Sequence, residues 1–499
     1  MSRTRIIQGK YIKTVGGDYN ISSEGNIFSS ASGEVREKGT DNGVLYNTYE
    51  RLGNEISEDF EISFSLKKDS GYSTLVPFGV LDFEGNYENA NFAFNYSLML
   101  GNIDSLEFKV LNEDGSTLFA ITNLPDIVVT ARRLPKLSKD ISDKKPEYDF
   151  SNPVRVWDWK SIFNSYNTPS SDYTKIGSYI IFWDGFDNEN KYDSSKFNNK
   201  KLKAIITASK NGKQKSKEVE FSTNYDEVEW VDVKIDKNNK KIDATLRVNL
   251  KDGGAEGLEC SSHLSGMKDE TRWVETCPWD KIPASELVPG KPPLRTRTRS
   301  FADLEKLTID GLNYHWGRNK NHAAAKDVKI VGEAYEVYVN AINTTEKSMD
   351  DISLVYNTNG SWMRSGNPGT ATLNPISWVG NMISREAVCY NVGYIKYSNG
   401  WSYETENNED VEFKETAAHE VGHEILKSYG GTVYSYGHKG SVNVVTQSNS
   451  DRSTNYPTTG EIDIMPYYNN YIPVSERRRM SAAEKDVLSL VWLTKLKIN

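Results

Sequence analysis

Cysteine is scarce in this 499-residue sequence, and its scarcity excludes one class of protein at once. The chain has three cysteines, Cys260, Cys277 and Cys389. Small disulfide-built scaffolds need a much denser and usually even set of cysteines, so this chain is not one of them. A single Cys260–Cys277 bridge and three reduced thiols both remain open at this stage.

Long apolar runs are also missing. No stretch approaches the roughly 18–20 apolar residues that a membrane-spanning helix needs, so no membrane span is predicted. The first thirteen residues, Met1 to Lys13, contain no apolar core of the kind found in secretory signal peptides. We therefore expect a protein that is either cytoplasmic or exported by a route that reads another signal.

An excess of positive charge is absent as well. Lysine and arginine number 60 against 69 acidic residues, which gives a net charge of −9 and argues against a nucleic-acid binder. Hydrophobic residues make up only 37 %, which suits several β-rich modules, each with one solvated face. The 11 Trp and 17 Phe nevertheless exclude a fully disordered chain.

A repeat of eight residues occupies positions 8–39. Its second position is always glycine (Gly9, Gly17, Gly25 and Gly33), and its fourth is always apolar. Because eight is even, a strand would place all four apolar residues on one face, and the glycines suit bends between strands. One such ribbon cannot bury its own apolar stripe, so we expect a stacked β-prism or β-helix-like stalk assembled with copies of itself.

Alternating apolar residues and turn signals divide the remainder of the chain into modules. Residues 56–130 predict an antiparallel β-sandwich, 131–151 a charged linker, and 152–252 a second sandwich with immunoglobulin-like strand spacing. Helical patterns begin after residue 252. The predicted fold is therefore multidomain: a stalk (1–55), two antiparallel β-sandwich modules, and an α+β domain over 253–499.

The strongest chemical signal is the pentapeptide His419-Glu-Val-Gly-His423. It lies in a helix-forming run that Gly430-Gly431 should end. Residues four apart share a helix face, so both imidazoles can reach one ion. Glu420 follows the first histidine directly and could take a proton from a zinc-bound water. The pattern predicts a Zn²⁺ site with His419 and His423 as ligands and Glu420 as general base.

A catalytic zinc site needs a third protein ligand. The downstream candidates are Glu461, which we favour, His438 and Asp463. If Glu461 binds the metal, His438 remains available as a catalytic donor that stabilises an oxyanion. Tyr434 and Tyr436 are alternatives for that role, and Asp463 could orient a ligating histidine.

Two further segments of the C-terminal domain carry expectations. Val328–Ile342 alternates and would form either an edge strand that binds extended substrate or a central strand that does not. Ser481-Ala-Ala-Glu484 has the pattern of a capping box at the start of a core helix.

The segment from about 300 to 470 resembles the zincin-type metallopeptidase domains fused behind VgrG-type spike proteins of type VI secretion systems. The residues that carry the resemblance are Thr416–Leu426, Tyr436–Ser441 and Gly460–Met465, with Asn357–Asn359 and Arg364–Gly369 as weaker matches. It implies zinc held by His419, His423 and Glu461. The octads at 8–39 are similar to the β-prism of the spike.

These observations lead to one functional expectation and two alternatives. We expect a zinc endopeptidase that acts as an effector or toxin, secreted without a signal peptide by a contractile apparatus and acting in a target cell, including its periplasm. Its expected partners are a protein or peptide substrate, components of the secretion spike and tube, a cognate immunity protein, and two further copies of the chain in a homotrimer through 8–39. The alternatives are a zinc amidase acting on cell-wall peptides and a non-enzymatic spike or adhesin with a structural metal.

Overall fold

The computed structural model describes most of the chain from Asp59 onward. The described residues are 59–69, 71–122, 130–131, 157–158, 173–266, 272–367, 386–444 and 446–499. Residues Phe60–Asn499 form one compact unit. The predicted octad stalk and nearly all of the predicted linker lie outside the described residues, so the stalk and its trimer remain predictions.

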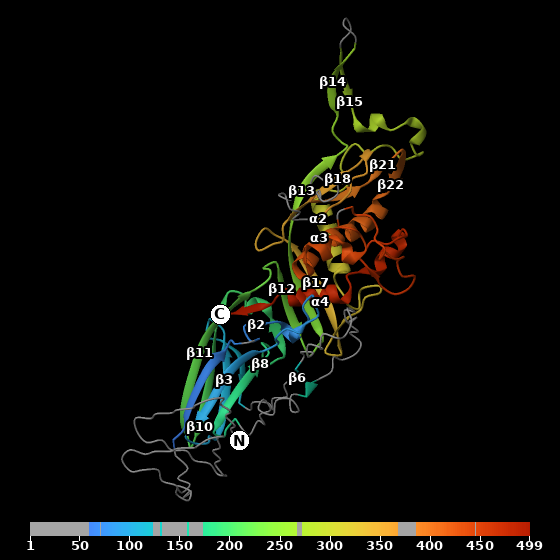
Figure 1. The fold of residues 1–499 in the computed structure, drawn as a ribbon. Helices are drawn as coiled ribbons and strands as arrows, with labels where there is room; N and C mark the ends of the chain where they lie inside the picture. The colour runs from blue at the N-terminus through green and yellow to red at the C-terminus, as the bar shows by residue number, and fades with distance from the viewer. Residues whose placement is uncertain are drawn as a thin grey trace, which may run out of the picture. The chain divides into compact units, whose positions relative to one another are not determined.

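A β-sandwich forms the first half of this unit, and two antiparallel sheets build it (Figure 1). The smaller sheet has the order β1-β3-β8 and the larger has the order β2-β25-β11-β10-β4-β5. The strands of the smaller sheet are β1 (Glu61–Lys67), β3 (Phe92–Met99) and β8 (Gly177–Trp183). Those of the larger sheet are β2 (Thr74–Leu75), β4 (Ser105–Leu111), β5 (Thr117–Ile121), β10 (Lys200–Lys210), β11 (Lys213–Tyr225) and β25 (Leu496–Ile498).

Aromatic side chains fill the space between the two sheets. Phe94 of β3 lies with its ring centroid 5.3 Å from that of Phe108 on β4 and 5.9 Å from that of Phe221 on β11. Phe64 of β1 reaches Phe108 at 6.3 Å. Strand alternation places these rings on the inner faces, where they bury the apolar area that stabilises the sandwich.

The predicted boundaries between modules need correction. β3, from the predicted sandwich at 56–130, pairs along its length with β8, from the predicted module at 152–252, and β4 pairs in the same way with β10. Strands from the two segments therefore build one sandwich, and residues 231–252 of the second segment join a different sheet, so the immunoglobulin-like module does not stand alone. The boundary at 252 falls within a continuous strand, β13 (Lys241–Glu256).

A mixed sheet links the sandwich to the helices. Its order is β16-β17-β13-β12-β9. From Asn249 on, β13 also pairs with β18, which in turn pairs with β20, and a bulge between Asp252 and Ala255 interrupts the β13–β18 pairing. The pairs β13–β17, β13–β18 and β18–β20 are parallel. The remaining strands are β9 (Lys191–Asp193), β12 (Val231–Asp236), β16 (Val328–Ile330), β17 (Glu333–Asn343), β18 (Asp351–Asn357) and β20 (Ala387–Asn391).

The segment Val328–Ile342 lies at one end of this sheet. It forms the hairpin β16–β17, in which β16 is the terminal strand and pairs with β17 over Glu333–Tyr335. On its other side β17 pairs with β13 from Glu336 to Asn343. Of the two alternatives, the structure therefore contains the one at the edge, and substrate binding there stays a prediction.

In the described part of the chain, three helices accompany the mixed sheet: α2 (Phe301–His315), α3 (Glu406–Tyr436) and α4 (Glu484–Trp492). α2 and α3 approach closely at Gly311, where an added Cβ would lie 2.2 Å from the Lys414 carbonyl oxygen. α4 belongs to the core, as predicted, but the capping box at Ser481 does not form. Ser481 lies in a short strand, and Glu484 accepts the Lys329 amide instead.

Short elements complete the described fold. The 3₁₀ turns are η1 (Pro77–Gly79), η4 (Ser194–Lys196), η5 (Pro278–Lys281), η6 (Ala284–Glu286), η8 (His438–Gly440) and η9 (Val474–Arg479). The short strands are β6 (Thr130–Ala131), β7 (Trp157–Asp158), β14 (Ser261–Ser265), β15 (Arg272–Thr276), β19 (Gly360–Ser361), β21 (Gly393–Tyr397), β22 (Gly400–Glu404), β23 (Ile462–Asp463) and β24 (Met480–Ser481). Among the described residues, no helix is both long and apolar enough to cross a membrane.

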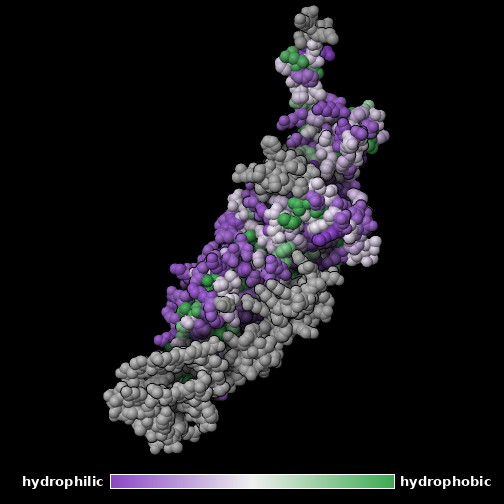
Figure 2. Space-filling view, in the orientation of Figure 1, coloured by the Kyte–Doolittle hydropathy of each residue, from purple (hydrophilic) through white to green (hydrophobic). Residues whose placement is uncertain are grey.

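The ribbon β14–β15 is exposed, and a disulfide closes its base. Cys260 and Cys277 are bonded, which settles the question that the sequence left open, and Cys389 is a buried free thiol. Leu264 and Trp273 face each other across the ribbon, and Trp273 is 70 % exposed. Figure 2 shows hydrophobic residues among the polar ones on this ribbon.

Candidate metal centre

The helix that carries the predicted motif forms as expected. α3 contains His419 and His423 on one face, both buried, with ring centroids 4.9 Å apart. Its regular geometry breaks at Gly431, which adopts a φ of +79° that glycine tolerates best. The predicted helix stop therefore appears as a break, and a short helical stretch carries the chain on to Tyr436.

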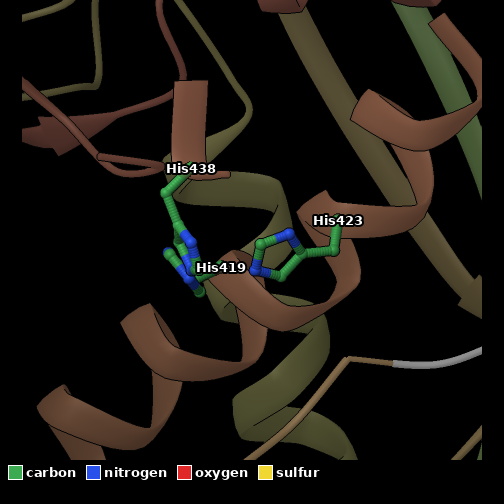
Figure 3. A group of neighbouring side chains, drawn as sticks. All are labelled: His419, His423 and His438. Atoms are coloured by element: carbon green, nitrogen blue, oxygen red, sulfur yellow. The ribbon is translucent and has the colours of Figure 1, made fainter. Parts of the chain in front are cut away.

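His438 completes the cluster. Its ring centroid lies 5.2 Å from that of His419 and 4.7 Å from that of His423. Each of the three residues offers a ligand atom within 4.8 Å of the others. Figure 3 shows the three rings converging, two from α3 and one from the segment that follows it.

Hydrogen bonds at Nδ1 orient all three rings. His419 Nδ1 lies 2.8 Å from the Ile464 carbonyl oxygen, and His438 Nδ1 lies 3.1 Å from that of Tyr436. A carbonyl only accepts, so each Nδ1 carries the proton. His423 Nδ1 lies 3.1 Å from Ser435 Oγ, whose own proton goes to the His423 carbonyl 2.7 Å away. His423 therefore donates from Nδ1 too, and Nε2 of every ring is left as a lone-pair donor.

The donor set fits a zinc ion. Nε2 of His419 and Nε2 of His438 are buried, and neither has a hydrogen-bond partner among the described residues. Such buried, unsatisfied atoms are costly unless something binds them. Burial lowers the pKa of His419 to about 4 and that of His438 to about 2, and it lowers the pKa of His423 well below its usual value. All three rings are therefore neutral at pH 7, the state in which imidazole binds zinc.

Glu461, the favoured third ligand, lies elsewhere and this prediction is corrected. Its Oε2 accepts a hydrogen bond from Arg318 Nη2 at 2.7 Å, and its side chain is 43 % exposed. The Arg318 guanidinium is buried and also donates to the carbonyls of Asp327 and Ala482. A buried cation fixed in this way needs a carboxylate, and Glu461 provides it.

Asp463 is not a ligand either. Its carboxylate pairs with Lys439 and accepts the Met465 amide at 3.2 Å. It does not orient a histidine directly, because the neighbouring Ile464 carbonyl holds His419. His438 consequently moves from the predicted catalytic role to that of the third candidate ligand.

Glu420 is buried next to His419. Burial raises the pKa of its carboxyl group to about 8, and the charge of Arg364 opposes that rise. A carboxyl group with a pKa near neutrality is suited to proton transfer. The group that the sequence predicts as general base is therefore buried, and its charge acts on Tyr467.

Tyr467 and Arg364 also belong to the site, although the sequence alone indicates no role for either residue. The Tyr467 ring lies 4.0 Å from that of His438 and 5.8 Å from that of His419, between centroids. Arg364, an exposed residue, interacts electrostatically with both the Tyr467 hydroxyl and Glu420. Arg364 lies in a weakly matched stretch of the resemblance, but no spacing rule singles out Tyr467.

The two tyrosines proposed for oxyanion binding have other partners. Tyr434 donates to Asp486 Oδ1 at 3.1 Å, so its hydroxyl is committed to that buried carboxylate. The Tyr436 ring meets that of His423 edge-on at 5.9 Å, and its hydroxyl interacts with Asn367. Tyr467 is therefore the better placed of the three.

The part of α3 that carries the two motif histidines is closely packed against its neighbours. Gly422 lies between the two motif histidines, and a Cβ added there would lie 2.8 Å from Trp316 Cζ2 and 2.8 Å from Met465 Sδ. The Trp316 indole also donates to the Ala418 carbonyl at 3.0 Å. Only a residue without a side chain lets α3 lie this close to its neighbours.

Comparisons with known proteins add little. No family model matches the chain, and no curated protein matches it. One solved structure that it matches is the apo structure of Bacteroides uniformis beta-glucuronidase 3, with 8 % identity and a TM-score of 0.15. The match covers 72 % of this chain and 32 % of the other, so the chain spans about a third of that neighbour. A likeness this weak carries no argument about fold or function.

Proposed function

We propose that this protein is a zinc-dependent peptidase whose metal is held by His419, His423 and His438. The observation that carries the proposal is the convergence of three neutral, buried imidazoles, oriented through Nδ1, with the buried Glu420 directly after His419 on the same helix. Three protein nitrogens leave one position of a tetrahedral site open, which is typical of catalytic rather than structural zinc.

In the proposed hydrolysis, the metal and the side chains of the protein would have different roles. When bound, zinc would polarise a scissile carbonyl and acidify a water, and its charge would favour the ionised form of Glu420. Glu420 accepts the proton of the attacking water and passes it to the leaving amine. Its burial keeps competing solvent away from the carboxylate and strengthens its interactions with nearby charges.

Arg364 and Tyr467 supply the donors for developing negative charge. The guanidinium and the phenol hydroxyl lie next to each other and next to the histidine cluster. Donors aimed at a tetrahedral intermediate lower its free energy most when they are held in place beforehand. Packing of its ring against His438 holds Tyr467 in this way. Arg364 and Tyr467 thus take the role first expected for His438.

The biological setting belongs to the same proposal. The resemblance to effector domains behind secretion spikes supports a toxin delivered into a target cell by a contractile apparatus. A zinc amidase that cleaves cell-wall peptides is the second candidate, since the same site would hydrolyse either amide. A purely structural metal is the third, and it would not require Glu420.

Glu420→Gln separates catalysis from metal binding. We expect the variant to retain one zinc per chain and to lose about 10²- to 10⁴-fold in turnover, the range for removal of a general base. The matched control is Glu424→Gln, because Glu424 lies one turn along the same helix and pairs with Lys427. It should keep both zinc and activity.

Two substrates then identify the reaction. Casein-like protein tests the peptidase, and purified peptidoglycan tests the amidase. Turnover of both by Glu420→Gln at the rate of the unaltered protein would exclude the proposed mechanism. A metal-loaded protein that hydrolyses neither substrate would leave only the structural role.

A further inference from the structure

The backbone at the third candidate ligand is unusual. His438, Lys439 and Gly440 follow one another with φ values of +47°, +60° and +90°. Side chains other than glycine disfavour this left-handed region, because Cβ approaches the following carbonyl. Such conformations persist only where surrounding contacts fix them, so something must hold this segment in place.

Lys439 makes the contacts that can do so. Its ammonium group lies 2.6 Å from Asp486 Oδ2 on α4 and also pairs with Asp463 on β23. Asp486 is fully buried, and only 17 % of the Lys439 side chain is exposed. Removal of one member of such a buried ion pair strongly destabilises a protein, because the remaining charge is left without a partner.

The ion pair of Lys439 with Asp463 also lies next to the backbone that orients His419, a second candidate ligand. Asp463 directly precedes Ile464, and the Ile464 carbonyl accepts the Nδ1 proton of His419 at 2.8 Å. Lys439 therefore connects the backbone next to His438 with the backbone that orients His419. Partners that orient metal-binding histidines usually contribute measurably to metal affinity.

A further contact secures the His438 carbonyl. Ser441 Oγ donates to it at 2.8 Å and accepts the Tyr467 amide at 2.8 Å. The backbone on either side of the turn is thus tied to the segment that carries both Ile464 and Tyr467. Lys439 is the charged member of this set and the one that spans three elements.

We propose that Lys439 is a positioning residue for the metal centre. Its ion pairs with Asp463 and Asp486 hold the left-handed turn in which His438 points at His419 and His423, and they fix the carbonyl that orients His419. The proposal rests on the metal site put forward above, but it concerns the affinity of that site and not its catalysis.

The test compares Lys439→Met with Lys495→Met. Lys495 is a matched control because 15 % of its side chain is exposed and it pairs with two carboxylates, Glu88 and Glu227. Zn²⁺ affinity is measured by competition with a chromophoric chelator, and ligand geometry by the visible spectrum of the Co²⁺ form. We expect Lys439→Met to bind Zn²⁺ about 10- to 100-fold more weakly, with an altered Co²⁺ spectrum, and Lys495→Met to match the unaltered protein.

Asp463→Asn keeps the proposal testable if Lys439→Met does not fold. It retains the pairing of Lys439 with Asp486 and removes only the charge of the link to Ile464, so its Zn²⁺ affinity should fall by a smaller factor. Folded variants with unchanged Zn²⁺ affinity, even if they melt at lower temperature, would overturn the proposal. Absence of Zn²⁺ binding by the unaltered protein would instead overturn the metal site itself, which separates the two failures.

Discussion

Arg318 and Glu461 form an ion pair across 143 residues of sequence, with Nη2 and Oε2 2.7 Å apart. This pair decides which residue completes the histidine cluster. A carboxylate bound to a buried guanidinium is not available to a metal, and His438 takes the position instead.

Substitution of the two rival ligands should therefore have opposite results. We expect His438→Ala to weaken Zn²⁺ binding by more than about 100-fold, above the usual effect of losing an orienting partner. Glu461→Gln should retain one zinc per chain, because Gln can still accept from Arg318. Metal content after dialysis and chelator competition measure both. Loss of zinc from Glu461→Gln with retention by His438→Ala would reverse the assignment.

The hydroxyl of Ser435 is expected to matter through His423. Ser435→Ala removes the acceptor for the His423 Nδ1 proton, which lies 3.1 Å from Ser435 Oγ. The ring would lose its orientation, and we expect Zn²⁺ affinity to fall by about 10- to 100-fold. Ser216→Ala, on an exposed strand of the sandwich, is the control and should have no effect. Equal Zn²⁺ dissociation constants for the two variants would refute this role.

Gly422→Ala should destabilise the protein, although alanine usually favours a helix. The intrinsic gain is about 1 kcal/mol, whereas the new methyl group would overlap Trp316 and Met465, both 2.8 Å away. Overpacking of a buried site typically costs about 1–3 kcal/mol, so the free energy of unfolding should fall. Urea unfolding measures it. Gly400→Ala is the control, since nothing lies within 4 Å of its Cβ position. A stabilised Gly422→Ala would show that the helix can move away.

Acid should destabilise the fold through His315. Burial lowers the pKa of this histidine to about 4, while an unfolded histidine titrates near 6.5. Between these values the unfolded state binds more protons, so stability falls as pH decreases from about 6.5 to about 4. The full contribution is about 3 kcal/mol.

Urea unfolding of the unaltered protein and of His315→Gln, both with a chelator present, measures this effect. Because the three candidate ligands titrate in both proteins, their contribution cancels in the difference. The variant should lose less stability over the same pH range. Identical pH profiles would show that His315 does not contribute.

Loss of the disulfide should have a local effect. Cys260 and Cys277 close a loop across 17 positions of sequence, and in a chain-entropy model such a cross-link contributes about 3 kcal/mol. The double variant Cys260→Ser, Cys277→Ser should be cleaved faster by trypsin after Lys268 or Arg272. Its Zn²⁺ affinity should not change, because the exposed ribbon does not contribute to the histidine cluster. Mass spectrometry of the first fragments identifies the cleavage site, and a weakened metal site would contradict the expected independence.

The parts of the structure that the sequence predicts are those set by local pattern. The motif helix and its break at Gly431 follow from spacing and from glycine chemistry, and strand alternation predicts β1 and β4. The choice of partner strand is different, because residues such as Tyr96 and Tyr179 pair across more than 80 positions. Alternation identifies a strand but not the strand next to it.

The preference for Glu461 over His438 as third candidate ligand has a related cause. His438 reaches the cluster through consecutive left-handed residues, two of which are not glycine, and no sequence rule predicts such a turn. Glu461, the candidate that the sequence favoured, is held away from the site by Arg318, whose position depends on the whole fold. Tyr467 likewise lies beside His419 and His438 only because the fold brings these parts of the chain together, and no local pattern indicates it.

β25 joins the far end of the chain to the sandwich. Only a few residues after α4, Leu496 pairs with Tyr225 on one side and with Leu75 on the other. A fragment beginning at residue 253 would cut β13 in two and would lack the strands that pair with β25. The segment that carries the histidine cluster should therefore not fold on its own. Residues 60–499 should consequently unfold in a single cooperative transition. A metal ion bound by the three histidines would then raise the melting temperature of the sandwich, with its aromatic core, as well as that of the metal site.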